Sequence, residues 1–172
     1  DVMGGKVDVA IRSGPLADSP LTARRLGETG RSVVASPAYL AREGTPETPA
    51  DLALHNCLDF GFRRAEPGWP FREGDGTTIL PVRGNMTANS GETLVQLARD
   101  GHGITRVGTF HVADDLAAGR LVTVLDAFNP GDREALHAVF VGGAAMPARI
   151  RVLVDFLAER MASGEVRRAI AG

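Results

Sequence analysis

The chain has 172 residues, enough for one ordinary domain or two small lobes, and its 44% hydrophobic and 23% charged residues are typical of a globular protein. No apolar run approaches the roughly 20 residues that cross a bilayer, and no export signal is visible. Its 19 basic and 21 acidic residues give a net charge of −2, which disfavours nucleic-acid binding because that requires a clustered basic face. A single cysteine, Cys57, excludes an internal disulfide and favours a reducing, cytoplasmic setting.

Strand-like and helix-like segments alternate along the chain, which predicts an α/β fold. In the first part, strands are expected at residues 7–12 and 32–35. Ser36-Pro37 predicts a helix start and Gly44 its end, and Thr48-Pro49 repeats the start signal. The stretch 63–76, rich in Gly, Pro and charge, predicts an exposed loop.

The second part continues the alternation. One or two strands are expected in 78–87, and a helix follows, capped by Asn89 with Glu92 completing a capping box. Further segments are expected as strands at 104–107, 121–125 and 136–141 and as a short helix at 112–118. Residues 147–161 give the clearest helix, with an apolar stripe formed by Ile150, Leu153, Val154, Leu157 and Met161. Its Ile150/Leu153/Leu157 face is expected to be buried against the domain.

Signatures of catalysis are missing from this sequence. It has no Gly-x-Ser-x-Gly elbow, no phosphate-binding loop and no His-Glu-x-x-His helix. The four histidines are scattered without metal-ligand spacing, and Cys57 is interpreted as a small buried hydrophobe. We therefore expect no catalytic residue, no metal site, no cofactor and no enzyme activity.

A series of short segments, taken in order, carries a resemblance to a known family. They are 5–14 (GKVDVAIRSG), 21–27 (LTARRLG), 35–40 (ASPAYL), 44–46 (GTP), 49–52 (PADL), 101–104 (GHGI), 114–122 (DDLAAGRLV), 137–140 (HAVF) and 155–157 (DFL). Together they resemble the effector-binding domain of LysR-type transcriptional regulators, from residue 1 to about residue 161. The chain departs from many members at Thr105-Arg106-Val107-Gly108, where an Ala-Leu-Leu-Pro-like stretch is common after Gly-Ile.

The resemblance implies a two-lobed, type II periplasmic-binding-protein-like α/β fold. On this pattern, lobe one holds residues 1–30 and 129–172 and lacks its first strands and helix, and lobe two holds 31–128. The chain would cross between lobes near residues 30 and 128, and we expect each lobe to have its own sheet. The winged helix-turn-helix that precedes this domain in the family is missing, so DNA would be bound only through that N-terminal part.

Ligands of open α/β sheets bind beyond strand carboxyl ends, which selects the candidate effector-binding residues. They are Ile11, Arg12, Ser13, Gly14, Phe62, Asn89, Ser90, Thr105 and Arg106. Alternatives stay open: Asn89 and Ser90 could only cap their own helix, Arg12 could pair with a surface carboxylate, and Phe62 could simply pack. Thr105 and Arg106 point to opposite faces if their segment is a strand.

The function that the resemblance implies is effector sensing. A small molecule, with carboxylates as the first class to test, would bind between the lobes and modulate transcription in a cytoplasmic homodimer or tetramer without membrane contact. The alternative is a solute-binding protein of a transport system, which shares the fold. An enzyme ranks third, and would require a pocket with a strongly perturbed acid, base or nucleophile.

Overall fold

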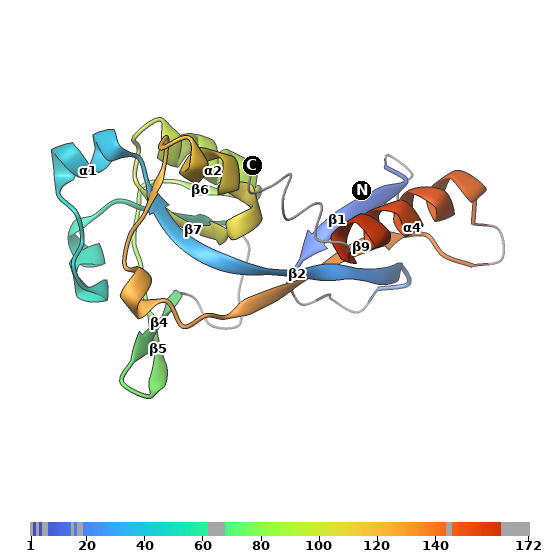
Figure 1. Cartoon of the computed structure of the whole chain (residues 1–172), viewed down its shortest axis with the longest axis horizontal. Coiled ribbons are helices and arrows are strands. Elements are labelled where there is room, and N and C mark those ends of the chain that lie inside the picture. The colour runs from blue at the N-terminus through green and yellow to red at the C-terminus, as the bar shows by residue number, and fades with distance from the viewer. Residues whose placement is uncertain are drawn as a thin grey trace. The chain divides into compact units, whose positions relative to one another are not determined.

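The computed structural model describes residues 2, 4, 7–14, 16, 19–61, 68–143 and 146–162, in a mixed α/β arrangement (Figure 1). The strands are β1 (Val9–Ser13), β2 (Thr22–Ala35), β3 (Cys57–Phe60), β4 (Trp69–Glu73), β5 (Gly76–Leu80), β6 (Thr87–Ala88), β7 (Ile104–Gly108), β8 (Val122–Thr123) and β9 (Arg133–Phe140). The α-helices are α1 (Pro37–Glu43), α2 (Gly91–Arg99), α3 (Ala113–Ala117) and α4 (Ala148–Ala162), and the 3₁₀ turns are η1 (Pro49–Leu54), η2 (Thr109–His111) and η3 (Asp126–Phe128). None of the described helices is long and apolar enough to span a membrane.

The chain divides into two compact units. The first contains the described residues of Asp1–Thr29 and Arg133–Ile170, and the described residues of the second lie in Gly30–Asp132. Strand β2 passes from the first unit into the second, and the chain returns between Asp132 and Arg133 at the start of β9. Each unit is described below by itself.

The first unit is built on an antiparallel ladder between β1 and β9, which runs from Val9↔Phe140 to Ser13↔Leu136. Helix α4 follows β9 and buries Ile150 and Val154, whereas Leu153 is 44% exposed. The prediction that Leu153 belongs to the buried stripe is therefore wrong. Ile150 and Val154, spaced i and i+4, share the covered face of the helix, and Leu153 at i+3 lies beside that face.

The second unit contains β7 between β2 and β3, with β6 beyond β3. Strands β3, β6 and β7 run parallel, while β2 pairs with β7 antiparallel. One core joins α2 to the sheet through Leu94, Val95 and Ala98, which are buried with Val34 and Leu58. A second core combines Val33, Tyr39, Leu52, Cys57, Trp69, Phe71 and Ile104. Since neighbouring strand residues such as Val33 and Val34 belong to different cores, both faces of this sheet are covered.

The start signals of the short helices are confirmed. The Ser36 side chain accepts a hydrogen bond from the Tyr39 backbone N–H, and α1 ends at Gly44. Before η1, Asp51 and Thr48 form a reciprocal capping box, and the backbone N–H and hydroxyl of Thr48 hold the pKa of the Asp51 carboxyl below its usual value. Local signals therefore set these two boundaries.

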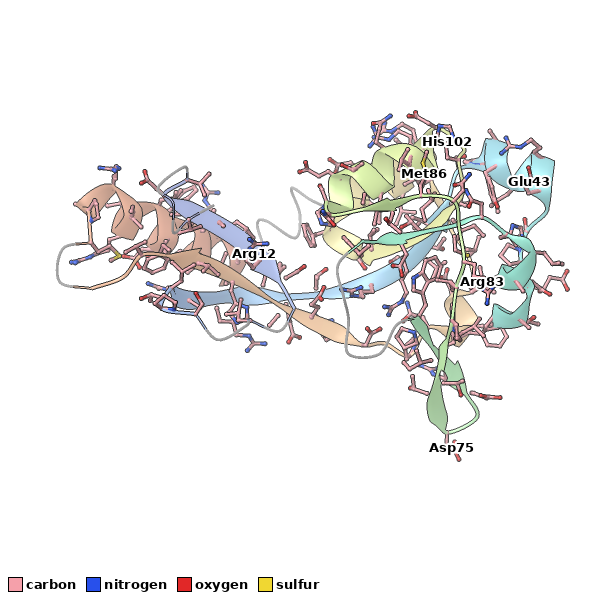
Figure 2. The ribbon with its side chains drawn as sticks, turned by 180° about the vertical axis from the view of Figure 1, so that it is seen from behind. Arg12, Glu43, Asp75, Arg83, Met86 and His102 are labelled. Carbon is pink, nitrogen blue, oxygen red and sulfur yellow. The ribbon has the colours of Figure 1, made fainter. Side chains whose placement is uncertain are left out.

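Three expectations are wrong. The described part of 63–76 is not an exposed loop, because β4 and β5 form a hairpin that buries Trp69 and Phe71 while Asp75 lies at its tip (Figure 2). The predicted Asn89–Glu92 capping box is absent, since the N-cap of α2 is Ser90 and it makes no side-chain capping bond. The strand pairing also runs from one unit into the other rather than forming two separate sheets, because the 14-residue β2 belongs to both units.

Candidate functional site

The carboxyl ends of the parallel strands β3, β6 and β7 meet at one edge of the second unit. Gly61 follows β3 there and donates its backbone N–H to Ala88 O at 3.0 Å. Asn89 and Ser90 follow β6 and lead into α2 (Figure 1), while Thr109 follows β7. Such an edge is where open α/β sheets place their ligands, because loops and helix N-termini converge on it.

The N-terminus of α2 carries the polar groups of this edge. The first N–H groups of a helix have no intrahelical acceptor, and the Ser90 side chain does not cap them. Asn89 and Ser90 are both exposed. Because the Ser90 side chain makes no capping bond, it does not support the alternative that these residues only cap their own helix. Glu92 is the acidic residue of the first turn, and its carboxylate already interacts favourably with the helix dipole.

Two glycines let neighbouring segments approach this helix start. A methyl group at Gly61 would lie 3.0 Å from Asn89 Oδ1 and 3.2 Å from Thr87 Oγ1. A methyl group at Gly91 would lie 2.6 Å from His111 Nε2, so the imidazole packs directly on the first residue of α2. The edge therefore gathers hydroxyl, amide and imidazole groups from segments far apart in the sequence.

Strand β7 turns its two predicted site residues to opposite faces, as expected for a strand. Thr105 is fully buried and donates its hydroxyl to Leu58 O at 2.9 Å. Arg106 is 3% exposed, and its guanidinium forms an ion pair with Asp132. Both side chains are therefore engaged within the second unit.

The remaining predicted site residues belong to the first unit or lie outside the described residues. Ile11, Arg12 and Ser13 lie on β1 of the first unit and are exposed (Figure 2 labels Arg12). Gly14 follows with φ of 87°, and its N–H donates to Ala135 O at 3.0 Å. The predicted contact residue Phe62 lies outside the described residues.

Two polar residues of the edge were not selected from the sequence. The hydroxyl groups of Thr109 and Ser32 share a hydrogen bond, with 3.0 Å between their oxygens. His111 packs against Gly91. From the sequence, a surface or packing role is the expectation for His111, as for the other scattered histidines. Its one signal was position, four residues after a predicted strand, which does not distinguish it from an ordinary loop histidine. Among the described residues, no group of three His, Cys, Asp or Glu side chains could hold a metal ion.

Cys57 is buried in the core of the second unit, as expected, and contacts Leu52 O at 3.7 Å. Burial, with a smaller contribution from Asp59, raises the pKa of its thiol to about 12. We expect Cys57 to be unreactive toward a thiol reagent at pH 8, because thiol reactivity requires the thiolate and the thiolate is disfavoured below this pKa. Labelling with an aromatic disulfide should be at least ~100-fold slower in the native protein than in guanidinium chloride. Equal rates in the two conditions would show that Cys57 is accessible.

Known proteins resemble this chain over most of its length. The transcriptional regulator CrgA of Neisseria meningitidis serogroup C is 38% identical over 160 residues, which cover 91% of this chain and 52% of that protein. The regulator DmlR of Escherichia coli is 33% identical over 164 residues, with 94% of this chain and 52% of that protein covered. The solved regulatory domain of CrgA from Neisseria meningitidis superposes with a TM-score of 0.81 at 36% identity, covering 93% of this chain and 78% of that domain.

The chain thus spans about half the length of the curated relatives it matches. Its relatives are transcriptional regulators, and the matched structure is a regulatory domain with the two-lobed periplasmic-binding-protein-like fold that the resemblance implied. The family model described as LysR substrate binding domain matches residues 1–162. By sequence, structure and family model alike, this chain belongs to the LysR family as its substrate-binding domain.

Proposed function

We propose that the chain is the effector-sensing domain of a cytoplasmic LysR-type transcriptional regulator. The observation that supports this most strongly is the family match over residues 1–162, together with regulators as relatives. The alternative, a transport solute-binding protein, finds no support in these relatives. We also propose that the two compact units correspond to the two lobes of the family fold, 1–30 with 129–172 and 31–128.

The proposed effector contact in the second unit is the uncapped start of α2. Asn89 and Ser90 are exposed there, and the N–H groups of the first turn can donate to an acceptor on a ligand. A small organic carboxylate is the ligand class that these donors favour, while Glu92 in the same turn disfavours a multiply charged anion. Ile11 to Gly14 of β1 and its following turn are proposed as the contribution of the first unit.

In the complete regulator, the domain would act on a DNA-binding part outside this chain. The proposed assembly is a homodimer or tetramer, in which a two-fold axis pairs identical surfaces. An effector can shift such an assembly only if it binds one conformation better than the other.

A thermal-shift screen of aromatic and aliphatic carboxylates tests the sensing role. A ligand present at a hundredfold excess over its Kd stabilises the folded state by about 2.7 kcal/mol, or roughly 5–10 °C in Tm for a domain of this size. With a hit in hand, Asn89→Ala should weaken binding by about 3–10-fold through loss of one hydrogen bond. Arg12→Ala tests the first unit in the same assay.

Gln96→Ala is the matched control for Asn89→Ala. It removes an exposed side-chain amide from the same helix, away from the helix start, where Gln96 bonds Asp100. Its ligand affinity should equal that of the parent. Hits whose affinity is unaffected by Asn89→Ala would mean that the effector binds elsewhere, and a screen without any hit among carboxylates would reject that ligand class.

A further inference from the structure

The return connection between the two units has an ion pair on each side of its boundary. Asp132 is the last residue of the second unit, and it pairs with Arg106 on β7 of that same unit. Arg133 is the first residue of the returning first-unit segment, and it pairs with Glu28 on β2 within the first unit. Consecutive residues of the chain are therefore held by different units.

The ion pair on the second-unit side contains a buried member, whereas both members of the pair on the first-unit side are exposed. The Arg106 side chain is 3% exposed, against 38% for Asp132, so the carboxylate meets a guanidinium fixed inside the unit. Arg106 is also held in register opposite Val33 of β2. Three residues earlier, Asn129 donates its side-chain amide to Arg31 O at 2.8 Å and accepts from the Gly131 N–H at 2.9 Å. The segment from Asn129 to Asp132 is thus bonded to the second unit at both ends.

We infer that the Arg106–Asp132 ion pair anchors the connection through which the chain returns to the first unit, called the return hinge below. The ion pair confines bending of this connection to the Asp132–Arg133 junction. Arg106 acts as a positioning residue, because its guanidinium is used by Asp132 rather than by a ligand. A short hinge limits the relative positions that the two units can adopt. The regulatory meaning of this limit rests on the proposed sensing function, in which an effector selects among those positions.

Releasing Asp132 should lengthen the hinge. Asn129 would then be the next anchor, and the freed residues 130–132 would form a flexible connection with an r.m.s. span of about 9–10 Å. Because β2 still links the units as a continuous strand, only part of that span becomes available to their motion. The expected effect is a broader distribution of distances between the units, by several ångström.

Spin-label distance measurements on the whole chain test this inference without any effector. Cys57→Ala removes the single native cysteine, and labels are placed at Gln96→Cys on α2 and Glu159→Cys on α4, both exposed helix positions in different units. Asp132→Asn is expected to broaden the distance distribution. Asp126→Asn is the matched control, because it makes the same chemical change at a carboxylate that accepts a hydrogen bond from nearby Thr123 and leaves the hinge pair intact.

Asp132→Asn also leaves a buried guanidinium without its carboxylate, which can unfold a protein. The double variant Arg106→Leu with Asp132→Asn removes both charges and keeps an apolar side chain in the buried position, so its Tm should stay near that of the parent. It is expected to show the same broadening. A folded double variant with the parental distribution would overturn the anchor, and so would a double variant that fails to fold, since the pair would then serve folding alone. Neither result depends on effector binding, so the sensing function would be judged separately.

Discussion

Trp69→Ala should be among the most destabilising single substitutions in this chain. The indole is 0% exposed and belongs to the core that contains Tyr39, Leu52 and Phe71. Truncating a fully buried aromatic side chain removes its apolar contacts and leaves a cavity, which costs about 3–5 kcal/mol. That is a large part of the roughly 5–15 kcal/mol by which a typical domain is stable. Urea unfolding followed by circular dichroism should show a much lower midpoint, with the same slope if the transition stays two-state.

Two further variants separate core packing from the loss of any aromatic residue. Trp69→Phe keeps a ring in the core, and the buried Trp69 Nε1 has no hydrogen-bond partner among the described residues, so its cost should be about 1–2 kcal/mol. Phe156→Ala truncates an aromatic on α4 that is 49% exposed, and its cost should stay within about 1 kcal/mol. A Trp69→Ala protein as stable as Phe156→Ala would show that the hairpin is not anchored in the core.

Gly103→Ala should also destabilise the second unit strongly. A methyl group at this position would lie 2.3 Å from Asn56 O and 3.1 Å from Leu58 Cγ. Asn56 O accepts the Ile104 N–H at 2.9 Å, and this bond opens the parallel pairing of β3 with β7. Because backbone rather than a flexible side chain is in the way, the two strands must separate at their start. We expect a loss of about 2–4 kcal/mol, measured as the urea midpoint.

Gly76→Ala is the control for this glycine. Its added methyl group would meet Glu73 O at 3.7 Å, an ordinary van der Waals contact, and Gly76 itself is an exposed residue of β5. Its stability should change by less than about 0.5 kcal/mol. If the two alanine variants were equally stable, the close approach at Gly103 would be relieved by movements too small to matter.

In α2, the sequence predicts the helix but not its N-cap. The sequence predicts the helix through Leu94, Leu97 and Ala98, which repeat at helical spacing. Leu94 and Ala98 are buried in the structure. Its cap was predicted incorrectly, because Asn89 with Glu92 and Ser90 without a partner are equally plausible from the sequence. Which residue starts the helix depends on where β6 ends, and β6 exists only through its pairing with β3.

The sequence alone determined the features that have a local physical cause. The Ser36 cap, the Thr48–Asp51 box and the strand character of 104–107 each follow from neighbouring residues. The family resemblance likewise depends on short segments in order, and the match over residues 1–162 confirms it.

Only the tertiary structure decided the features that depend on distant partners. Trp69 lies in a stretch rich in Gly, Pro and charge, and its burial comes from residues such as Tyr39 and Leu52, which are not its neighbours in sequence. Leu153 is as apolar as its neighbour Val154, but Val154 is buried and Leu153 is 44% exposed. The sequence predicts Arg106 as a ligand contact, but in the structure its guanidinium forms an ion pair with Asp132. The sequence determines the polarity of each side chain. Which apolar surface or opposite charge that side chain contacts depends on packing between distant segments, and this packing also determines which faces are covered.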